Sequence, residues 1–178
     1  MVMEIQIIKC SDDMIEKLGL FYDDCVLYMD NNNINYPKWT YKQYPTTHSV
    51  IDATKNGSQY YCTYNNEICA AFVLNSDPGG AYDKGDWKIN LNQGEYLIIH
   101  ALSVSHKFAH NGIASKIIDF CVNQAKSNGF KAVRVDVVPE NIPAIKLYEK
   151  YGFTFAGNKD LLRGFEEIPT FCLYEYNF

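Results

Sequence analysis

Residues 96–114 read YLIIHALSVSHKFAHNGIA, an apolar run that leads through a polar turn to a glycine. The run Tyr96–Val104 predicts a buried strand, and Gly112 opens a helical pattern in which Ile113 and Ile117 share one face. A strand that turns into a helix start presents unpaired backbone N–H groups and the positive end of the helix at one point, which suits a phosphate. Gly112 lets a ligand approach because it has no Cβ, although a lone glycine here fits an ordinary tight turn better.

Residues 138–153 read VPENIPAIKLYEKYGF, and together with the first segment they favour the phosphate site over an ordinary turn. Together the two segments resemble the GNAT superfamily of acetyl-CoA-dependent N-acetyltransferases. The superfamily pattern is a strand, the turn Q/R-x-x-G-x-G/A, a helix, a strand and then N-x-x-A-x-x-L-Y-x-x-x-G-F. The matching residues here are Ala109-x-x-Gly112-x-Ala114 and Asn141-x-x-Ala144-x-x-Leu147-Tyr148-x-x-x-Gly152-Phe153. The element order outside them is also similar, so the resemblance covers nearly the whole chain.

Hydrophobic periodicity predicts the remaining elements. We expect further strands at Glu4–Lys9, Gln59–Thr63, Ile68–Leu74, Lys131–Val138, Phe153–Ala156 and Thr170–Tyr176. We expect helices after Ser11 (as N-cap), at Thr46–Asn56, at Gly112–Ser127 and at Asn141–Tyr151. Hairpins combined with strand–helix–strand crossovers predict an α/β (α+β) fold: one domain over residues 1–178, with a mixed, twisted sheet of about seven strands and helices on both faces. Between the strands, residues 75–93 form a long connection of a kind typical of lids and binding loops.

The composition fits one globular domain: 178 residues, 47% hydrophobic and 21% charged. The net charge of −5 disfavours nucleic acids and anionic membranes as partners. No apolar run is long enough to span a bilayer. The six cysteines include no C-x-x-C pair, so we expect reduced, mostly buried thiols in a cytoplasmic protein. No His or Cys spacing indicates a metal site.

The resemblance implies acetyl-CoA as co-substrate, with no metal. It implies that pyrophosphate meets the turn and helix start at Ala109, Gly112, Ile113, Ala114 and Ser115, and that the pantetheine arm meets backbone groups of Leu102, Ser103 and Val104. Asn141 would cap a helix and contact the coenzyme, although capping alone explains an asparagine there. The superfamily has Gln or Arg in place of Ala109, which implies weaker coenzyme affinity unless Lys107 or Lys116 supplies a charge.

Two residues are implied as catalytic. Tyr148 would protonate the departing thiolate of coenzyme A, because a phenol donates a hydrogen bond and stays protonated at neutral pH. The alternative is a core tyrosine on an amphipathic helix. His100 would be the base or the head of a water relay; the alternatives are a buried strand histidine, with water or Glu95 as the base.

A shorter similarity concerns His100-Ala101-Leu102-Ser103-Val104, which is similar to the H-A-L-A-V run of arylalkylamine N-acetyltransferases. That branch uses two strand histidines, two residues apart. The upstream position here is Ile98, so only half of the pair is present.

An aromatic loop between the first two helices contains Tyr36 and Trp39. These residues would line the acceptor site or pack onto the core. The expected reaction is direct attack of a primary amine on acetyl-CoA in a ternary complex. The acceptor is a small molecule or peptide: polyamine, arylalkylamine, aminoglycoside and peptide N-terminus stay open, as does a homodimer. The alternatives are a non-catalytic acyl-CoA-binding sensor or interaction module, which Ala109 and the single histidine would suit, and an unrelated phosphate-binding α/β protein.

Overall fold

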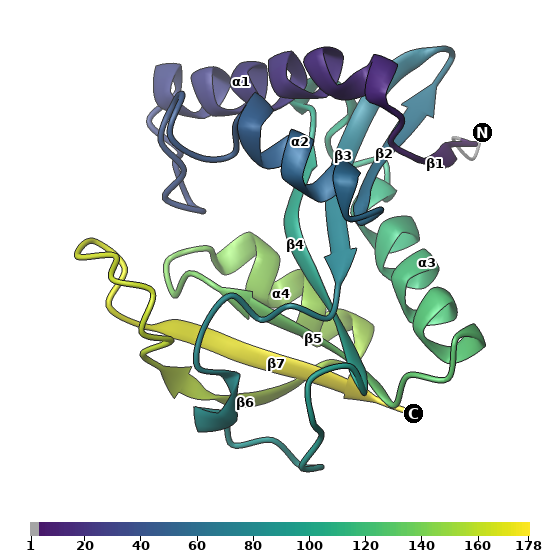
Figure 1. The fold of residues 1–178 in the computed structure, drawn as a ribbon. Helices are drawn as coiled ribbons and strands as arrows, with labels where there is room; N and C mark the ends of the chain where they lie inside the picture. Colours follow the sequence, from purple (N-terminus) through teal and green to yellow (C-terminus); the bar gives the residue numbers. More distant parts are fainter. Residues whose placement is uncertain (1–3) are drawn as a thin grey trace. The chain divides into compact units, whose positions relative to one another are not determined.

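The computed structural model describes residues 4–178 (Figure 1), so the first three residues of the predicted single domain lie outside it. Seven strands form one sheet in the order β1-β2-β3-β4-β5-β7-β6. β4 and β5 are parallel, whereas β1–β2, β2–β3, β5–β7 and β6–β7 are antiparallel. The predicted mixed sheet of about seven strands is therefore confirmed.

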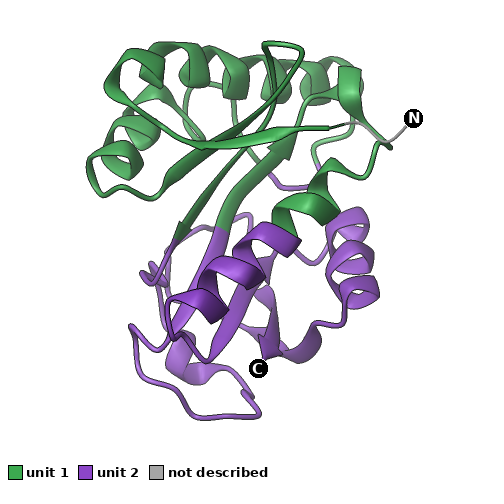
Figure 2. Ribbon diagram, turned by 90° about the vertical axis from the view of Figure 1, so that its right-hand side faces the viewer, with its two compact units in different colours: residues 1–35, 39–74, 100–118 green, residues 36–38, 75–99, 119–178 purple. Residues whose placement is uncertain are grey.

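Contacts divide the chain into two compact units (Figure 2). Unit 1 comprises the described residues up to Asn35, residues 39–74 and residues 100–118. Unit 2 comprises residues 36–38, 75–99 and 119–178. The strand β4 (Tyr96–Val104) and the helix α3 (Ile113–Ser127) each contribute residues to both units.

Unit 1 contains β1 (Gln6–Lys9), α1 (Ile15–Asn31), α2 (Thr47–Lys55), β2 (Gln59–Tyr64) and nearly all of β3 (Glu67–Asn75). Its core lies where α1 and α2 pack on β2 and β3, and includes Leu18 and Val50, both 0% exposed (Figure 1). Asn65 and Asn66 have φ values of 49° and 64°, as the tightest hairpin turns require. This hairpin follows local sequence rules.

The start of α1 differs from the prediction. Ser11 precedes a short 3₁₀ turn at Asp12–Met14, and its side chain makes no capping hydrogen bond. Its hydroxyl donates to Asp13 Oδ1 at 2.5 Å instead. Because the 3₁₀ turn intervenes, α1 begins at Ile15 and Ser11 is too far away to cap it. In α2, by contrast, Thr46 accepts a hydrogen bond from the Ser49 N–H in a complete capping box.

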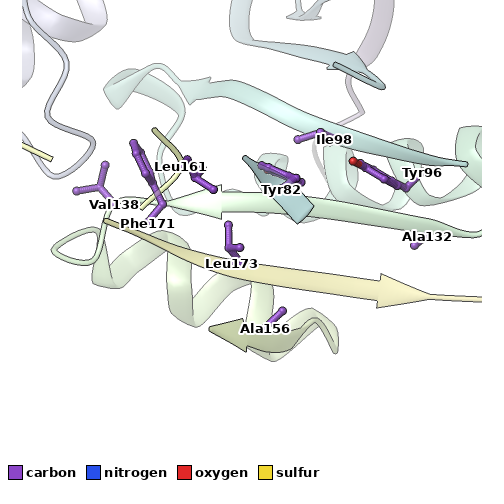
Figure 3. Close-up of a cluster of buried hydrophobic side chains, with 9 residues drawn as sticks. All are labelled: Tyr82, Tyr96, Ile98, Ala132, Val138, Ala156, Leu161, Phe171 and Leu173. Atoms are coloured by element: carbon purple, nitrogen blue, oxygen red, sulfur yellow. The ribbon is translucent and has the colours of Figure 1, made fainter. Parts of the chain in front are cut away.

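Unit 2 contains β5 (Ala132–Val137), α4 (Ile142–Tyr151), β6 (Thr154–Lys159) and β7 (Phe171–Asn177). Figure 3 shows a cluster of buried residues in this unit: Tyr82, Tyr96, Ile98, Ala132, Val138, Ala156, Leu161, Phe171 and Leu173. Tyr82 comes from the long connection between β3 and β4 and is only 2% exposed. That connection therefore supplies part of the core and is not a simple surface loop.

A buried arginine holds the same connection on the sheet. The guanidinium of Arg134 lies 4.0 Å from the ring centre of Trp87 and 4.2 Å from that of Tyr96. It donates to the Ile89 carbonyl at 3.0 Å and lies 3.7 Å from the Glu175 carboxylate. A charge that leaves water needs such partners. The connection expected as a lid is thus anchored to β5 and β7.

All six cysteines are free thiols, as predicted; five are buried and Cys172 is half-buried. Among residues 4–178, no helix has both the length and the apolar character needed to cross a bilayer.

Candidate functional site

The second half of β4 contains an irregularity at Ala101. Its φ is 47°, a left-handed conformation that alanine rarely adopts inside a strand. We interpret this left-handed residue as a β-bulge, a feature that changes the direction of the backbone groups that follow. Leu102 and Val104 are half-buried and Ser103 is buried. His100, also half-buried, comes directly before the bulge.

The turn that follows β4 is anchored to three elements of unit 1. The Ser105 N–H donates to the Cys69 carbonyl at 2.9 Å. The imidazole of His106 stacks on Tyr28 of α1, with 3.8 Å between the ring centres and 1° between their planes. Phe108 packs edge-on against Tyr64 of β2. These contacts hold the turn in place before any ligand binds.

The same turn ends in a small loop that points backbone groups outward. The Asn111 side-chain amide donates to the carbonyls of Phe108 and Ala109, each at 3.1 Å. Gly112 follows with φ of 72°, and α3 begins at Ile113. The first N–H groups of a helix have no intrahelical acceptor, so they are available to an anion. A Cβ built on Gly112 would meet no protein atom within 4 Å, so the space beside it is open.

Two lysines near this loop are candidates to replace the usual Gln or Arg. Lys107 has its Nζ 3.0 Å from Glu67 Oε1 in an exposed ion pair, and its role toward the coenzyme stays a prediction. Its charge is thereby partly compensated. Ala109 is exposed, and Lys116 on the first turn of α3 is half-buried. A role for Lys116 toward the coenzyme stays a prediction.

We expect Gly112→Val to raise the dissociation constant of acetyl-CoA about 10- to 100-fold, which is about 1.4 to 2.8 kcal/mol. The new side chain projects into the open space where the pyrophosphate is expected. Gly129→Val is the matched control, because Gly129 has φ of 79° and also faces open space. Both variants lose about 1–3 kcal/mol of folding free energy to backbone strain. Calorimetric titration separates them, and equal affinities would place the phosphate elsewhere.

An aromatic group of unit 1 lies beside the bulge. Trp39 packs edge-on against Tyr22 and Tyr44, with ring centres 6.2 Å apart in each pair. The Trp39 backbone N–H donates to Asn35 Oδ1 at 3.0 Å, which fixes the loop. Trp39 thus packs against the core while remaining half-exposed. Tyr36, the other predicted acceptor residue, belongs to unit 2 and is 44% exposed.

The start of α4 explains part of the second motif. Asn141 Oδ1 accepts a hydrogen bond from the Ala144 N–H at 3.3 Å, so asparagine caps the helix. Pro143 occupies the first turn, where the missing N–H costs nothing. The capping role predicted for Asn141 is confirmed, and its contact with the coenzyme stays a prediction.

The end of α4 explains the rest of that motif. Gly152 is left-handed, with φ of 108°, and its N–H donates to the Glu149 carbonyl at 3.0 Å. The Phe153 N–H donates to the Tyr148 carbonyl at 3.0 Å, and the two rings pack 5.2 Å apart. This is a Schellman ending with its usual apolar contact. Tyr148 itself is 6% exposed, and burial raises the pKa of its phenol well above the ordinary value.

Glu95 is a poor base, contrary to the alternative considered from the sequence. Its carboxylate pairs with Lys131 and accepts the Asn92 N–H at 2.8 Å. The hydrogen bond from Lys131, followed by that from Asn92, lowers the pKa of Glu95. A carboxylate stabilised in its charged form takes up a proton less readily. Of the two protein groups considered, Glu95 is therefore the less suited, and the role of His100 as the base stays a prediction.

The predicted site residues fall into two groups. Unit 1 contains the predicted residues of β4, of the turn and of the α3 start, together with the acceptor candidate Trp39. The residues of the segment are His100, Leu102, Ser103, Val104, Ala109, Gly112, Ile113, Ala114 and Ser115. Unit 2 holds Tyr36, Asn141 and Tyr148. Within the described part of the chain, no group of three or more His, Cys, Asp or Glu side chains is arranged to hold a metal ion.

Comparison with known sequences finds a matching family and similar curated proteins. The sequence profile of the acetyltransferase (GNAT) family matches residues 26–153. A streptothricin acetyltransferase of Escherichia coli is 32% identical over 73 residues, which is 41% of this chain and 42% of that protein. An uncharacterized N-acetyltransferase of Methanocaldococcus jannaschii is 30% identical over 79 residues, 44% of this chain and 34% of that protein. The matches thus span less than half the length of these curated relatives.

Solved structures share the fold over almost the whole chain. The crystal structure of a GNAT-family acetyltransferase from Streptococcus agalactiae superposes with a TM-score of 0.78, covering 98% of this chain and 95% of that one at 17% identity. A second, from Listeria monocytogenes, has a TM-score of 0.77, covers 99% and 96% of the two chains and is 14% identical.

Proposed function

Since the chain belongs to the acetyltransferase (GNAT) family, we propose that it transfers an acetyl group from acetyl-CoA to the primary amine of a small molecule or peptide. The observation that carries this proposal is the β4–α3 segment of unit 1. There a bulged strand leads into an anchored turn and an open helix start at Gly112. An extended pantetheine arm followed by a pyrophosphate fits a strand followed by a helix N-terminus.

The coenzyme is held mainly by backbone groups. The N–H groups of Gly112, Ile113, Ala114 and Ser115 bind the pyrophosphate, and Ala109 adds no side-chain donor. Leu102, Ser103 and Val104 pair with the pantetheine amides in the manner of an added strand. Asn141 contacts the arm through its side-chain NH₂ group, because its Oδ1 already accepts the Ala144 N–H.

The transfer itself needs a base, an oxyanion site and an acid. Only a neutral amine attacks a thioester, and His100 removes the amine proton directly or through water. The amine nitrogen bonds to the acetyl carbon, strand N–H groups stabilise the oxyanion, and the C–S bond breaks. Tyr148 protonates the departing thiolate. Both reactants are held in one ternary complex, so proximity supplies much of the acceleration without an acetylated enzyme.

The acceptor is bound beside the aromatic group of unit 1. The half-exposed Trp39, packed on Tyr22 and fixed by Asn35, supports an acceptor with an apolar part next to its amine. Tyr36 is the second proposed acceptor contact. Because one matching relative is a streptothricin acetyltransferase, streptothricin itself is a specific acceptor to test. We also propose a cytoplasmic location, which the free thiols support.

Thiol release from acetyl-CoA, measured across a panel of amines, tests the proposal. The panel contains streptothricin, a polyamine, an arylalkylamine, an aminoglycoside and peptides with free N-termini. The expected result is amine-dependent thiol release with a matching amount of acetylated amine. Acetyl-CoA binding without turnover on any amine would favour the sensor alternative, and absence of binding would contradict the proposal entirely.

A further inference from the structure

One hydrogen bond in unit 1 joins helix α1 to the bulge in β4. The Tyr22 hydroxyl donates to the carbonyl oxygen of Ala101 at 2.9 Å. The acceptor belongs to the residue with φ of 47°. Tyr22 is 1% exposed, so the donor side of this bond lies away from competing water. Tyr22 thus gives the carbonyl of this irregular strand residue a partner from another element.

The Tyr22 hydroxyl also lies close to a buried amide. The NH₂ group of Gln59 donates its two hydrogens to the carbonyls of Phe72 and Tyr60, at 3.0 and 3.1 Å. The same nitrogen lies 3.5 Å from the Tyr22 oxygen. Gln59 is 1% exposed and is tied to the paired strands β2 and β3. The bulge is therefore tied to the rigid core of unit 1.

Burial also keeps the donor in its protonated form. Desolvation raises the pKa of Tyr22 far above the ordinary tyrosine value. The rings of Phe21 and Trp39 pack edge-on against it, with centres 5.7 Å and 6.2 Å away. These two contacts hold the Tyr22 ring, and with it the hydroxyl oxygen, in place beside Ala101.

We infer that Tyr22 is a positioning residue for acetyl-CoA binding: its hydrogen bond holds Ala101 in the left-handed conformation that directs the backbone of Leu102–Val104 toward the coenzyme. The inference rests on the proposed function, in which those backbone groups pair with the pantetheine arm. An alanine without this partner returns to negative φ, because its Cβ disfavours the left-handed region. The bulge then relaxes, and the groups that follow lose their direction.

Tyr22→Phe removes only the hydroxyl and keeps the packing of the ring. It is expected to raise the dissociation constant and the KM of acetyl-CoA roughly 3- to 30-fold, the range that a buried hydrogen bond spans. The kcat at saturating acetyl-CoA changes much less, since Tyr22 touches no reacting atom. Tyr61→Phe is the control: it removes a phenol from the same core cluster, on a residue whose strand partners are Ile8 and Ala71.

A second substitution separates positioning from mere stability. Glycine adopts the left-handed conformation without a steric cost, so Ala101→Gly in the Tyr22→Phe background restores acetyl-CoA affinity toward the wild-type value. The melting temperature stays low in the double variant, because the carbonyl still lacks its partner. A purely structural role for Tyr22 predicts the opposite, since glycine then lowers stability further and affinity stays low.

Calorimetry, steady-state kinetics and thermal unfolding on the same variants decide the question. Wild-type acetyl-CoA affinity in Tyr22→Phe, an equal loss in Tyr61→Phe, or no recovery with Ala101→Gly would each overturn the inference. If the wild-type protein binds no acetyl-CoA, the proposed function fails and the inference fails with it. If the wild-type protein binds and Tyr22→Phe binds equally well, only the inference fails.

Discussion

Replacing Tyr148 with phenylalanine is expected to lower kcat about 10²- to 10⁴-fold, the usual effect of removing a general acid. The substitution keeps the ring that packs on Phe153 at the end of α4, so the helix ending survives. It removes only the hydroxyl that we propose protonates the thiolate. The raised pKa of Tyr148 keeps that hydroxyl protonated across neutral and moderately alkaline pH. Acetyl-CoA affinity should change little.

Tyr151→Phe is the matched control for this experiment. Tyr151 lies on the same helix, and its hydroxyl donates to Asp119 at 2.6 Å. Its loss should cost some stability and leave turnover close to the wild-type value. Stopped-flow measurement of thiol release at saturating substrates compares the two variants. Full turnover in Tyr148→Phe would show that Tyr148 is only a core residue.

Replacing His100 with glutamine is expected to lower kcat/KM about 10²- to 10⁴-fold, the range for loss of a general base. The wild-type rate should rise with pH through a limb that reports the base and the acceptor amine, and the variant should show an altered limb. Acetyl-CoA affinity should stay nearly unchanged. Since Ile98 stands where a second histidine would be and Glu95 is ion-paired, we expect water to carry the remaining proton transfer.

His48→Gln provides the control, because His48 is a surface residue on α2 that pairs with Asp52. The melting temperature and the pH–rate profile are measured for both variants. A His100 variant that is destabilised, but whose folded fraction turns over normally, would remove the base role. A normal melting temperature with the rate lost would support it.

Local rules predicted those parts of the fold that depend on a few adjacent residues. The hairpin at Asn65-Asn66 and the cap at Asn141 follow from side chains that favour turns and helix starts. Gly152 adopts the left-handed conformation that a Schellman ending needs, and Phe153 makes its apolar contact. Much of the second motif therefore has a structural reason. The same rules failed at Ser11, where a 3₁₀ turn competes with capping.

Contacts between distant residues could not be predicted in the same way. No strand pattern indicates that Arg134 would be buried between Trp87 and Tyr96. Likewise, Arg163 donates two hydrogen bonds to the Asp136 carboxylate, at 2.7 and 3.0 Å, although the two residues are 27 positions apart along the chain. Such partners are brought together only by the complete fold.

The bulge at Ala101 shows the same limit within the candidate site. Residue preferences place glycine or asparagine, not alanine, in the left-handed region. The hydrogen bond that supports this conformation comes from Tyr22, 79 residues earlier in the chain. The sequence therefore predicted a coenzyme-binding strand at Leu102–Val104, but not the feature that directs its backbone.

An amide NMR titration of the wild-type protein with acetyl-CoA tests the central claim, that the β4–α3 segment of unit 1 binds the coenzyme. The N–H signals of Leu102, Val104 and the first turn of α3, Ile113–Ser115, should shift with one saturable binding curve. The N–H signals of β1 and of α2, elements of unit 1 outside the segment, should stay nearly unchanged. Saturable binding that leaves the β4 and α3 signals in place, and shifts others instead, would contradict the account.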